Sequence, residues 1–297
     1  MSTATTLLAC IALPLLAPLL ITALHRWPNP REAVTLLTAA GLLLLVLSLY
    51  GTLQGGAMPV VPVAEPIPGL AIAFVLEPLG LLFATLASFL WLVTSVYAIG
   101  YMRSHHEKKQ TSFYSCFAIA LASVMGIAFA SNLFTLFIFY EVLTLSTYPL
   151  VTHAGTRAAR DGGRVYLAYL LGSSVVLLLL ALVWTWSLTG TLDFREGGIL
   201  AGTVSPVMAG VLLMLYIFGI GKAAVMPMHL WLPAAMVAPT PVSALLHAVA
   251  VVKAGVFTVL KVVVYIFGLD FLADIPATQW LMYIAGATIL LASLVAL

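Results

Sequence analysis

Residues 132–151 read NLFTLFIFYEVLTLSTYPLV, an apolar run long enough to cross the hydrocarbon core of a bilayer. Its one charged residue, Glu141, is the tenth of these twenty residues. An ionised side chain at the bilayer centre costs roughly 2.5–3.5 kcal/mol on insertion scales, and such residues are functional as a rule. A glutamate that snorkels to the surface would lie near an end of the run. We therefore predict a membrane-spanning helix in which Glu141 takes part in ion translocation, in preference to a purely structural ion pair.

The composition of the chain indicates lipid, not water, as its main solvent. Of 297 residues, 63% are hydrophobic and 7% are charged. Soluble proteins carry about 25% charged residues. The net charge of +2, with no basic run beyond Lys108-Lys109, gives no reason to expect a nucleic-acid partner. Cys10 and Cys116 both lie in apolar segments, so we expect neither a disulfide framework nor a thiolate metal site.

Apolar runs that can cross about 30 Å of hydrocarbon recur along the chain. They predict an all-α, polytopic integral membrane protein with nine transmembrane helices, near residues 5–24, 33–53, 74–101, 113–130, 132–151, 164–188, 206–226, 241–267 and 280–297. Only Ser131-Asn132 separates the fourth and fifth runs, so these two helices must be antiparallel. The first run has no basic residue before it, unlike a cleaved signal peptide, and we interpret it as a retained span.

Basic residues are concentrated in alternate loops. One set of loops holds eight of them: Arg26, Arg31, Arg103, Lys108, Lys109, Arg157, Arg160 and Arg164. The opposite set holds Arg195 together with Asp193, Glu196, Asp270 and Asp274. The positive-inside rule places the first set in the cytoplasm, so we expect the N-terminus outside a bacterial plasma or inner membrane. The last run reaches Leu297 without a polar or aromatic anchor, which indicates either a shortened chain or a next segment on another polypeptide.

A second intramembrane charge, Lys222, lies in the apolar run 206–226. Gly219 and Gly221 leave the helix without side chains at two positions just before Lys222. Pro227 removes a backbone hydrogen-bond donor, so we expect it to break the helix. Non-helical backbone at membrane depth is tolerated where it lines a cavity or is covered by protein. The sequence therefore predicts a broken helix that brings polar backbone and water close to the lysine.

A third intramembrane charge, Lys253, lies in the run 241–267. His247 is six residues earlier, about 9 Å along a helix and on a different face, so waters or hydroxyls would have to connect the two groups. Ser243 shares the face of His247. Two interpretations of His247 stay open, a proton carrier and a structural histidine. Lys261 is near the end of the run, where snorkelling explains it at least as well as a relay.

Other histidines are weaker candidates. His229 follows the predicted helix break, and an interfacial role fits it as well as a relay role. His105-His106-Glu107 could bind a metal, but a solvated polar loop is the better interpretation because no further ligand is placed nearby. We expect this chain to hold no metal and no cofactor.

The three central charges suggest a mechanism. Burial favours the neutral form of a lysine, and a nearby carboxylate favours the charged form. If Glu141 approaches Lys222, the amine stays protonated; if the carboxylate is neutralised, the proton can move on. Lysine suits such a relay and arginine does not, because arginine stays charged.

Three stretches resemble the antiporter-like membrane subunits shared by Mrp-type multisubunit sodium/proton antiporters, respiratory complex I and membrane-bound hydrogenases. They are EPLGLLFATLASFLWLVTSVYAIGYM (77–102), the run 132–151 quoted above, and GKAAVMPMHLWLPAAMVAPTPVSALLHAVAVVKAGVF (221–257). The resemblance covers most of the chain from about residue 75 onward. Within this family, the sequence around Lys253 is most similar to the D-type and A-type members of the Mrp antiporters.

The resemblance implies that Glu141 and Lys222 form a pair that controls a half-channel and that Lys253 continues the relay. It implies three N-terminal helices in 1–110, a five-helix bundle in 111–268, and only the start of a second, inverted bundle in 269–297. The implied partners are other membrane subunits, lipid, and the transported ions H⁺ and Na⁺. Ala234 and Val237 stand where this family usually has an Asp and a Glu.

The sequence leaves three possible functions to be tested. The favoured one is a proton- or cation-translocating subunit of a larger complex, of Mrp type or, as the alternative, of complex I or hydrogenase type. The second is a shortened assembly subunit without transport. The third is an integral membrane enzyme, for which the sequence offers no nucleophile–base constellation or metal-ligand spacing.

Overall fold

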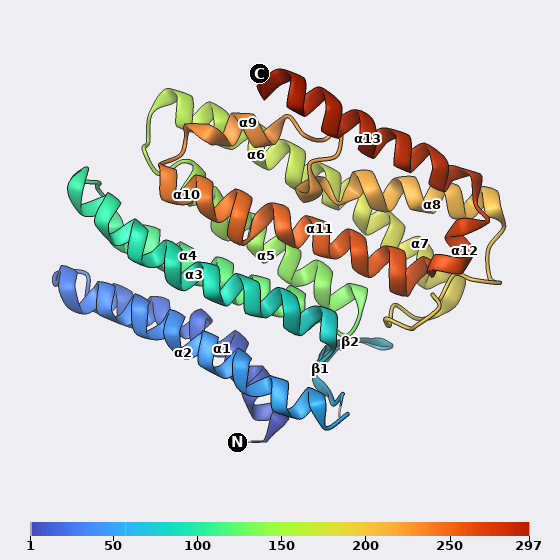
Figure 1. Ribbon diagram of the computed structural model, residues 1–297, viewed down its shortest axis with the longest axis horizontal. Helices are drawn as coiled ribbons and strands as arrows, with labels where there is room; N and C mark the ends of the chain where they lie inside the picture. The colour runs from blue at the N-terminus through green and yellow to red at the C-terminus, as the bar shows by residue number, and fades with distance from the viewer. Residues whose placement is uncertain (1, 57, 297) are drawn as a thin grey trace.

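The computed structural model describes residues 2–56 and 58–296 and is built almost entirely of helices that run side by side (Figure 1). Its first half contains α1 (Thr3–Ala23), α2 (Pro28–Gln54), β1 (Val60–Ile67), β2 (Leu70–Val75), α3 (Pro78–Ser104), α4 (Gln110–Ala128) and α5 (Leu133–Val151). In Figure 1 the chain progresses from α1 and α2 on one side, through α3, α4 and α5, to the later helices on the other.

The second half contains several interrupted helices. Its elements are α6 (Arg157–Ser173), η1 (Ser174–Leu178), α7 (Leu179–Thr189), α8 (Pro206–Gly219), η2 (Gly221–Ala223), α9 (Trp231–Ala234), η3 (Ala235–Val237), α10 (Thr240–Ala244), η4 (Leu245–Val249), α11 (Val251–Lys261), η5 (Val262–Phe267), α12 (Leu269–Ala273) and α13 (Pro276–Ala296). The segments η1, η4 and η5 have π-helical hydrogen bonding, whereas η2 and η3 are 3₁₀ turns.

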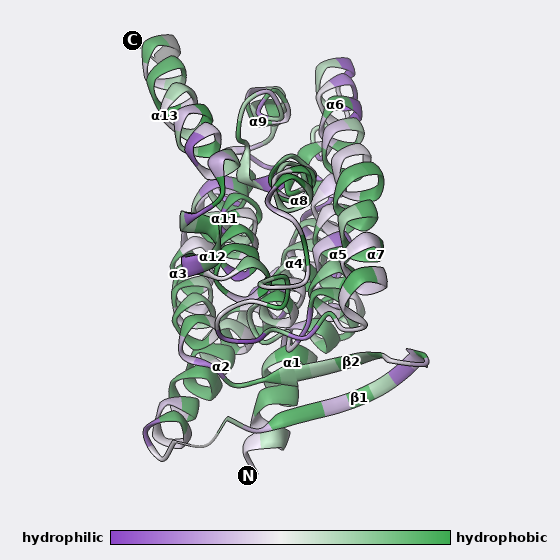
Figure 2. Ribbon diagram, turned by 90° about the vertical axis from the view of Figure 1, so that its right-hand side faces the viewer, coloured by the Kyte–Doolittle hydropathy of each residue, from purple (hydrophilic) through white to green (hydrophobic). Residues whose placement is uncertain are grey.

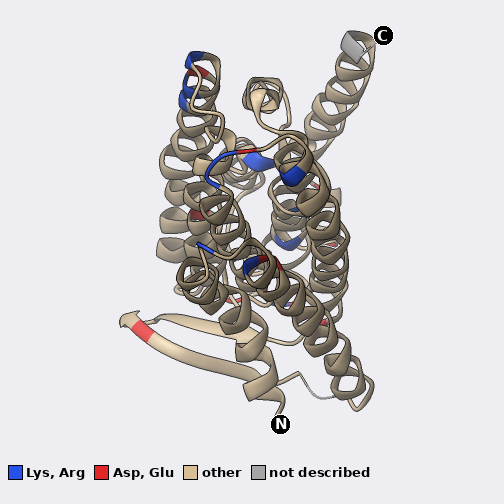
Figure 3. Cartoon of the chain, turned by 90° about the vertical axis from the view of Figure 1, so that its left-hand side faces the viewer, with Lys and Arg blue, Asp and Glu red and all other residues tan. Residues whose placement is uncertain are grey.

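The prediction of a polytopic, helical membrane protein is confirmed. Among the described residues, eight helices are long and apolar enough to cross a membrane, and α8 is a shorter apolar helix. These nine segments correspond to the nine predicted spans. Figure 2 shows the same helices coloured predominantly as hydrophobic, and Figure 3 shows how sparse charged residues are along them.

The two-stranded sheet β1–β2 is a feature that the sequence interpretation missed. No strand was predicted and the third span was expected to start at residue 74, yet β1 covers Val60–Ile67 and β2 extends to Val75. Glu77 precedes a proline, which disfavours helical backbone at Glu77, and Pro78 is well suited to the first position of a helix. The third span therefore begins at Pro78.

The sheet organises one end of the molecule, which we call the hairpin end. The turn between α4 and α5 joins it, because Val75 N–H donates to the Phe129 carbonyl and Ser131 N–H donates to the Ala73 carbonyl. Asn132 caps α5 by accepting a hydrogen bond from Thr135 N–H at 2.8 Å. The opposite end, which we call the basic end, contains the α1–α2, α3–α4 and α5–α6 connections.

A cluster of charged and polar side chains around the buried Glu32 connects helices near the basic end. Glu32 of α2 is buried and pairs with Arg103 of α3 and with its neighbour Arg31. Arg31 in turn donates to the Gln110 side chain at the start of α4, at 2.6 Å. This cluster connects α2 with α3 and with α4.

Candidate functional site

Lys222 lies at the interruption between α8 and α9 and is fully buried, with 0% of its surface exposed. Its amine donates hydrogen bonds to the Tyr140 carbonyl at 2.9 Å and to the Thr144 hydroxyl at 2.5 Å. The same amine lies 3.2 Å from the centre of the Tyr140 ring. Two residues of α5, Tyr140 and Thr144, therefore supply the polar and aromatic contacts of the lysine, and Glu141 lies between them in sequence.

Glu141 is near Lys222 but does not form a direct ion pair with it. Within residues 2–56 and 58–296, no contact of 4.0 Å or less joins the two charged groups, and both buried carboxylate oxygens lack a hydrogen-bond partner. The neighbour of Glu141 in sequence, Tyr140, does contact the Lys222 amine. A carboxylate that is buried without a hydrogen-bond partner is costly in free energy.

The helix break lies earlier than the sequence interpretation placed it. Pro227 was expected to cause it, but α8 already ends at Gly219, and the backbone leaves helical geometry at Ile220. Close packing explains this position. A Cβ on Gly219 would lie 2.5 Å from the Leu178 backbone nitrogen, and one on Gly221 would collide with the Ser173 hydroxyl. The two glycines thus allow the broken segment to approach α6 and η1 closely.

The polar backbone at the break is satisfied by aromatic side chains. The backbone N–H of Lys222 donates to the Tyr140 hydroxyl at 3.1 Å. The buried indole N–H of Trp231 donates to the Gly221 carbonyl at 2.9 Å. Such compensation is what non-helical backbone needs at membrane depth. Tyr140 and Trp231 were not among the predicted site residues, and their pairing with the break could not be inferred from spacing.

A row of buried hydroxyls continues from Lys222 toward the basic end. Thr144 contacts the amine, and Thr147 lies one turn further along α5. Thr147 and Tyr166 of α6 share a hydroxyl–hydroxyl hydrogen bond of 2.6 Å. The signal for Thr144 and Thr147 was present in the sequence, since they follow Glu141 by three and six residues.

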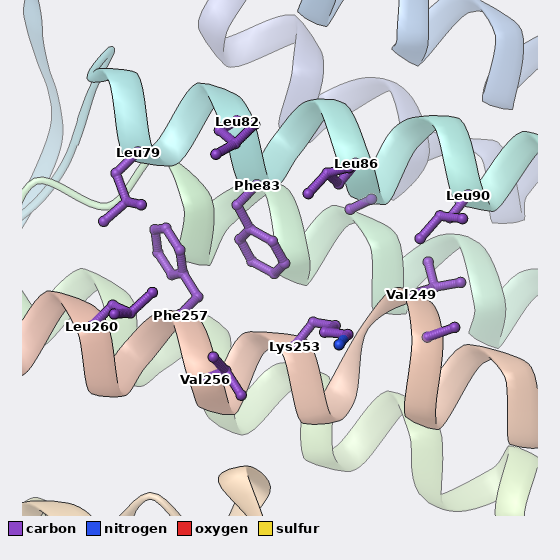
Figure 4. Close-up of a pocket in the computed structure, with 12 residues that line it drawn as sticks. Leu79, Leu82, Phe83, Leu86, Leu90, Val249, Lys253, Val256, Phe257 and Leu260 are labelled. Atoms are coloured by element: carbon purple, nitrogen blue, oxygen red, sulfur yellow. The ribbon is translucent and has the colours of Figure 1, made fainter.

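Lys253 lies apart from this buried centre. It lines a groove of about 370 Å³ between α3 and α11. Figure 4 shows its side chain among apolar side chains such as Leu86, Phe83 and Val256. Its side chain is exposed. Among the described residues, no ion pair or hydrogen bond of its amine is found. A relay role for Lys253 therefore stays a prediction.

The other predicted residues near Lys253 do not join it. His247 lies in the π-helical segment η4, and its Nε2 is 3.3 Å from the Met236 sulfur. Ser243 is half-buried in α10. His229 lies in the turn that follows Pro227, and within the described chain its buried Nδ1 has no hydrogen-bond partner.

Snorkelling, one of the two interpretations of Lys261 left open by the sequence, is excluded by its burial. Its side chain is 0% exposed and forms an ion pair with Glu77, which directly precedes α3 and is 7% exposed. The amine also lies 3.9 Å from the centre of the Phe194 ring and 4.6 Å from that of Tyr265. Glu77 is 184 residues away in sequence, which is why the sequence interpretation missed this acid–amine pair.

Comparisons with known proteins agree with this arrangement. The family model described as NADH:quinone oxidoreductase/Mrp antiporter, TM, matches residues 130–297. Chain 5 of the NAD(P)H-quinone oxidoreductase from Synechocystis sp. is 33% identical over 202 residues, covering 65% of this chain and 29% of that protein. The A/B-type component of a probable K⁺/H⁺ antiporter from Rhizobium meliloti is 30% identical over 231 residues, covering 76% of this chain and 22% of that protein.

Solved structures show the same fold. A chain of the Mrp complex from Dietzia sp. DQ12-45-1b matches 94% of this chain with a TM-score of 0.78 and 27% identity. A chain of an archaeal membrane-bound sulfane sulfur reductase matches 95% of it with a TM-score of 0.79 and 21% identity. This chain covers 29% and 56% of those two chains, respectively. It is a multi-pass membrane protein that belongs to the NADH:quinone oxidoreductase/Mrp antiporter transmembrane family.

Proposed function

We propose that this chain forms a proton- or monovalent-cation-translocating half-channel in a multisubunit membrane complex, most simply a cation/proton antiporter of Mrp type. The observation that carries the proposal is the fully buried Lys222 amine at the helix break, close to the unsatisfied Glu141 carboxylate. Relatives are named both as K⁺/H⁺ antiporter and as quinone oxidoreductase subunits. The half-channel is assigned to residues 111–268, with 1–110 as a peripheral three-span unit.

In this mechanism, Lys222 holds a proton while Glu141 is ionised, because the two opposite charges stabilise each other. When Glu141 takes up a proton or a cation, that stabilisation is lost. The amine then passes its proton to the Thr144 hydroxyl, which releases its own proton in the same step. The row formed with Thr147 and Tyr166 moves one proton on toward the basic end in the same way. The aromatic ring of Tyr140 keeps the amine in place during the exchange.

A proton-pumping role in a complex of quinone-oxidoreductase type is the second candidate, because the Synechocystis relative carries that name. Both versions place the chain in a bacterial plasma membrane with its N-terminus outside, as the distribution of basic loops indicates. The two versions differ in their driving force. Antiport responds to added Na⁺ or K⁺, whereas redox-driven pumping responds to an electron donor.

The test uses inverted membrane vesicles that contain the assembled complex and a fluorescent dye that reports a pH gradient. Glu141→Gln and Lys222→Met are each expected to lower the initial rate of proton movement at least tenfold, with the amount of assembled complex unchanged. Adding Na⁺, K⁺ or NADH in separate runs identifies the driving force. The matched control is Glu65→Gln, because Glu65 is exposed on the hairpin and should not affect transport.

Normal transport by both Glu141→Gln and Lys222→Met would overturn the proposal. A loss of assembled complex with unchanged transport per complex would instead favour a structural subunit. These outcomes separate ion translocation from an assembly role.

A further inference from the structure

Lys261 and Glu77 lie at the hairpin end, on the opposite side of the broken helix from the hydroxyl row. Lys261 is the last residue of α11, and Glu77 directly precedes α3. The lysine side chain is fully enclosed, whereas 10% of the glutamate side chain is exposed. The glutamate thus lies between the buried amine and the space outside it.

That space is a cavity of about 560 Å³. Glu77, Ser131, Asp193, Arg195 and Glu196 give it a polar lining, and the rings of Phe194 and Tyr265 that contact Lys261 form part of its wall. To hold one water molecule, a cavity needs roughly 10–15 Å³ of internal volume and two to four polar partners. The hairpin-end cavity is large and polar enough to hold many water molecules.

A short stretch of α11 connects Lys261 to the broken helix. Thr258 is buried one turn before it on α11, and Gly255 is one turn earlier still. Gly255 packs directly against the backbone of Lys222 and Ala223. Gly255 and Lys261 are six residues apart, about 9 Å along the helix. The distance from the broken segment to the ion pair is therefore short.

A buried ion pair is weak evidence for stability, because apolar residues of similar volume often stabilise a protein as well or better. Its position between the broken helix and a polar cavity gives this pair a functional explanation. We propose that Glu77 and Lys261 form a second proton-transfer pair, which exchanges protons between the interior of the half-channel and water in the hairpin-end cavity. This inference rests on the proposed transport function, because the half-channel supplies the protons that the pair would transfer.

The proton step is balanced. The Lys261 ammonium transfers a proton to the Glu77 carboxylate, which leaves a neutral amine and a neutral carboxylic acid. Glu77 then releases the proton to cavity water and becomes a carboxylate again. The amine is reprotonated from the interior of the half-channel, so both groups return to their starting forms.

The first test measures proton movement in vesicles of the assembled complex for Glu77→Gln, Lys261→Met and the double variant. We expect each to lower the rate at least tenfold. The double variant is decisive, because it removes both charges and leaves neither group unpaired. If the assembled double variant transports protons at the original rate, the Glu77–Lys261 pair has only a structural role, and the inference is overturned. Glu65→Gln again serves as the control.

The second test does not depend on transport or on a charged substitution. In a background of Cys10→Ala and Cys116→Ser, Ser131→Cys should react with a membrane-impermeant, sulfonated thiol reagent added on the hairpin side. Ser88→Cys is the matched control, since Ser88 is fully buried in α3 and should not react. Failure of Ser131→Cys to react from that side would overturn the water-filled cavity. Normal transport by both Glu141→Gln and Lys222→Met would overturn the proposed function and leave this labelling unchanged.

Discussion

Thr144 shows how a neutral residue can control a charged one. Its hydroxyl accepts a hydrogen bond from the Lys222 amine at 2.5 Å. A hydrogen bond to a charged group contributes about 1.5–3 kcal/mol. Thr144→Val should therefore lower the rate of proton movement about tenfold or more in assembled complex, while Thr144→Ser should retain most of it. Equal rates for the valine and serine variants would show that this hydroxyl has no part in transport.

His153 makes stability depend on pH at the basic end. Its side chain is 4% exposed, and burial lowers its pKa from the ordinary value of 6.5, an effect that the nearby Glu107 carboxylate partly opposes. The unfolded chain therefore binds a proton more readily than the folded chain. The free energy of unfolding should fall as the pH drops below 6.5 toward the lower folded pKa, and it should not change above that window.

The measurement is thermal unfolding of the detergent-solubilised protein between pH 8 and pH 5. His153→Gln should lose less stability on acidification than the unsubstituted chain. His25→Gln is the control, because His25 is exposed. An identical acid response in the His153→Gln variant would exclude this histidine as the cause.

Single residues also show where sequence interpretation succeeds and where it stops. Glu141 and Lys222 could be selected because an isolated charge in an apolar run is costly wherever it lies. The structure places both near the same helix break. The sequence could not decide between snorkelling and a relay role for Lys261, because nothing local in its segment or in that of Glu77 indicates their contact.

At the scale of elements, close backbone packing holds the broken helix against α11. A Cβ on Gly255 would lie 2.8 Å from Ala223 Cα and would also collide with the Lys222 backbone. Gly255→Ala should destabilise the protein by about 1–3 kcal/mol through overpacking. Gly172→Ala is the matched control, because a Cβ on Gly172 of α6 has no neighbour within 4 Å.

Thermal unfolding in detergent checks this prediction. The Gly172→Ala variant should unfold at the same or a slightly higher temperature, since alanine favours helix by about 0.5–1 kcal/mol over glycine. Equal unfolding temperatures for the two variants would contradict the packing argument.

Helices were predicted better than the breaks between and within them. Hydropathy identifies a span from many residues at once, so errors at single positions matter little. The π-helical segments η1, η4 and η5 depend on packing between helices and have no clear local signal. The hairpin β1–β2 was missed because prolines in β1 resemble loop residues, although an edge strand accepts them.

At the scale of the whole molecule, the two ends differ in charge, and this difference predicts orientation. Glu65 lies on the hairpin and Lys108 lies between α3 and α4, and both are exposed. In the background without native cysteines, Glu65→Cys should react with an impermeant thiol reagent added to the outer face of intact spheroplasts. Lys108→Cys should react only after the membrane is opened. The reverse pattern would show that the N-terminus faces the cytoplasm.

The hydrogen bond from the Trp231 indole to the Gly221 carbonyl gives this protein a built-in optical probe. Indole fluorescence responds to nearby charge, and this ring is bonded to the residue next to Lys222. A variant that retains Trp231 as its only tryptophan would report, by a change in emission, each gain or loss of the lysine's charge. Turnover could then be followed from inside the membrane in real time, without an added dye.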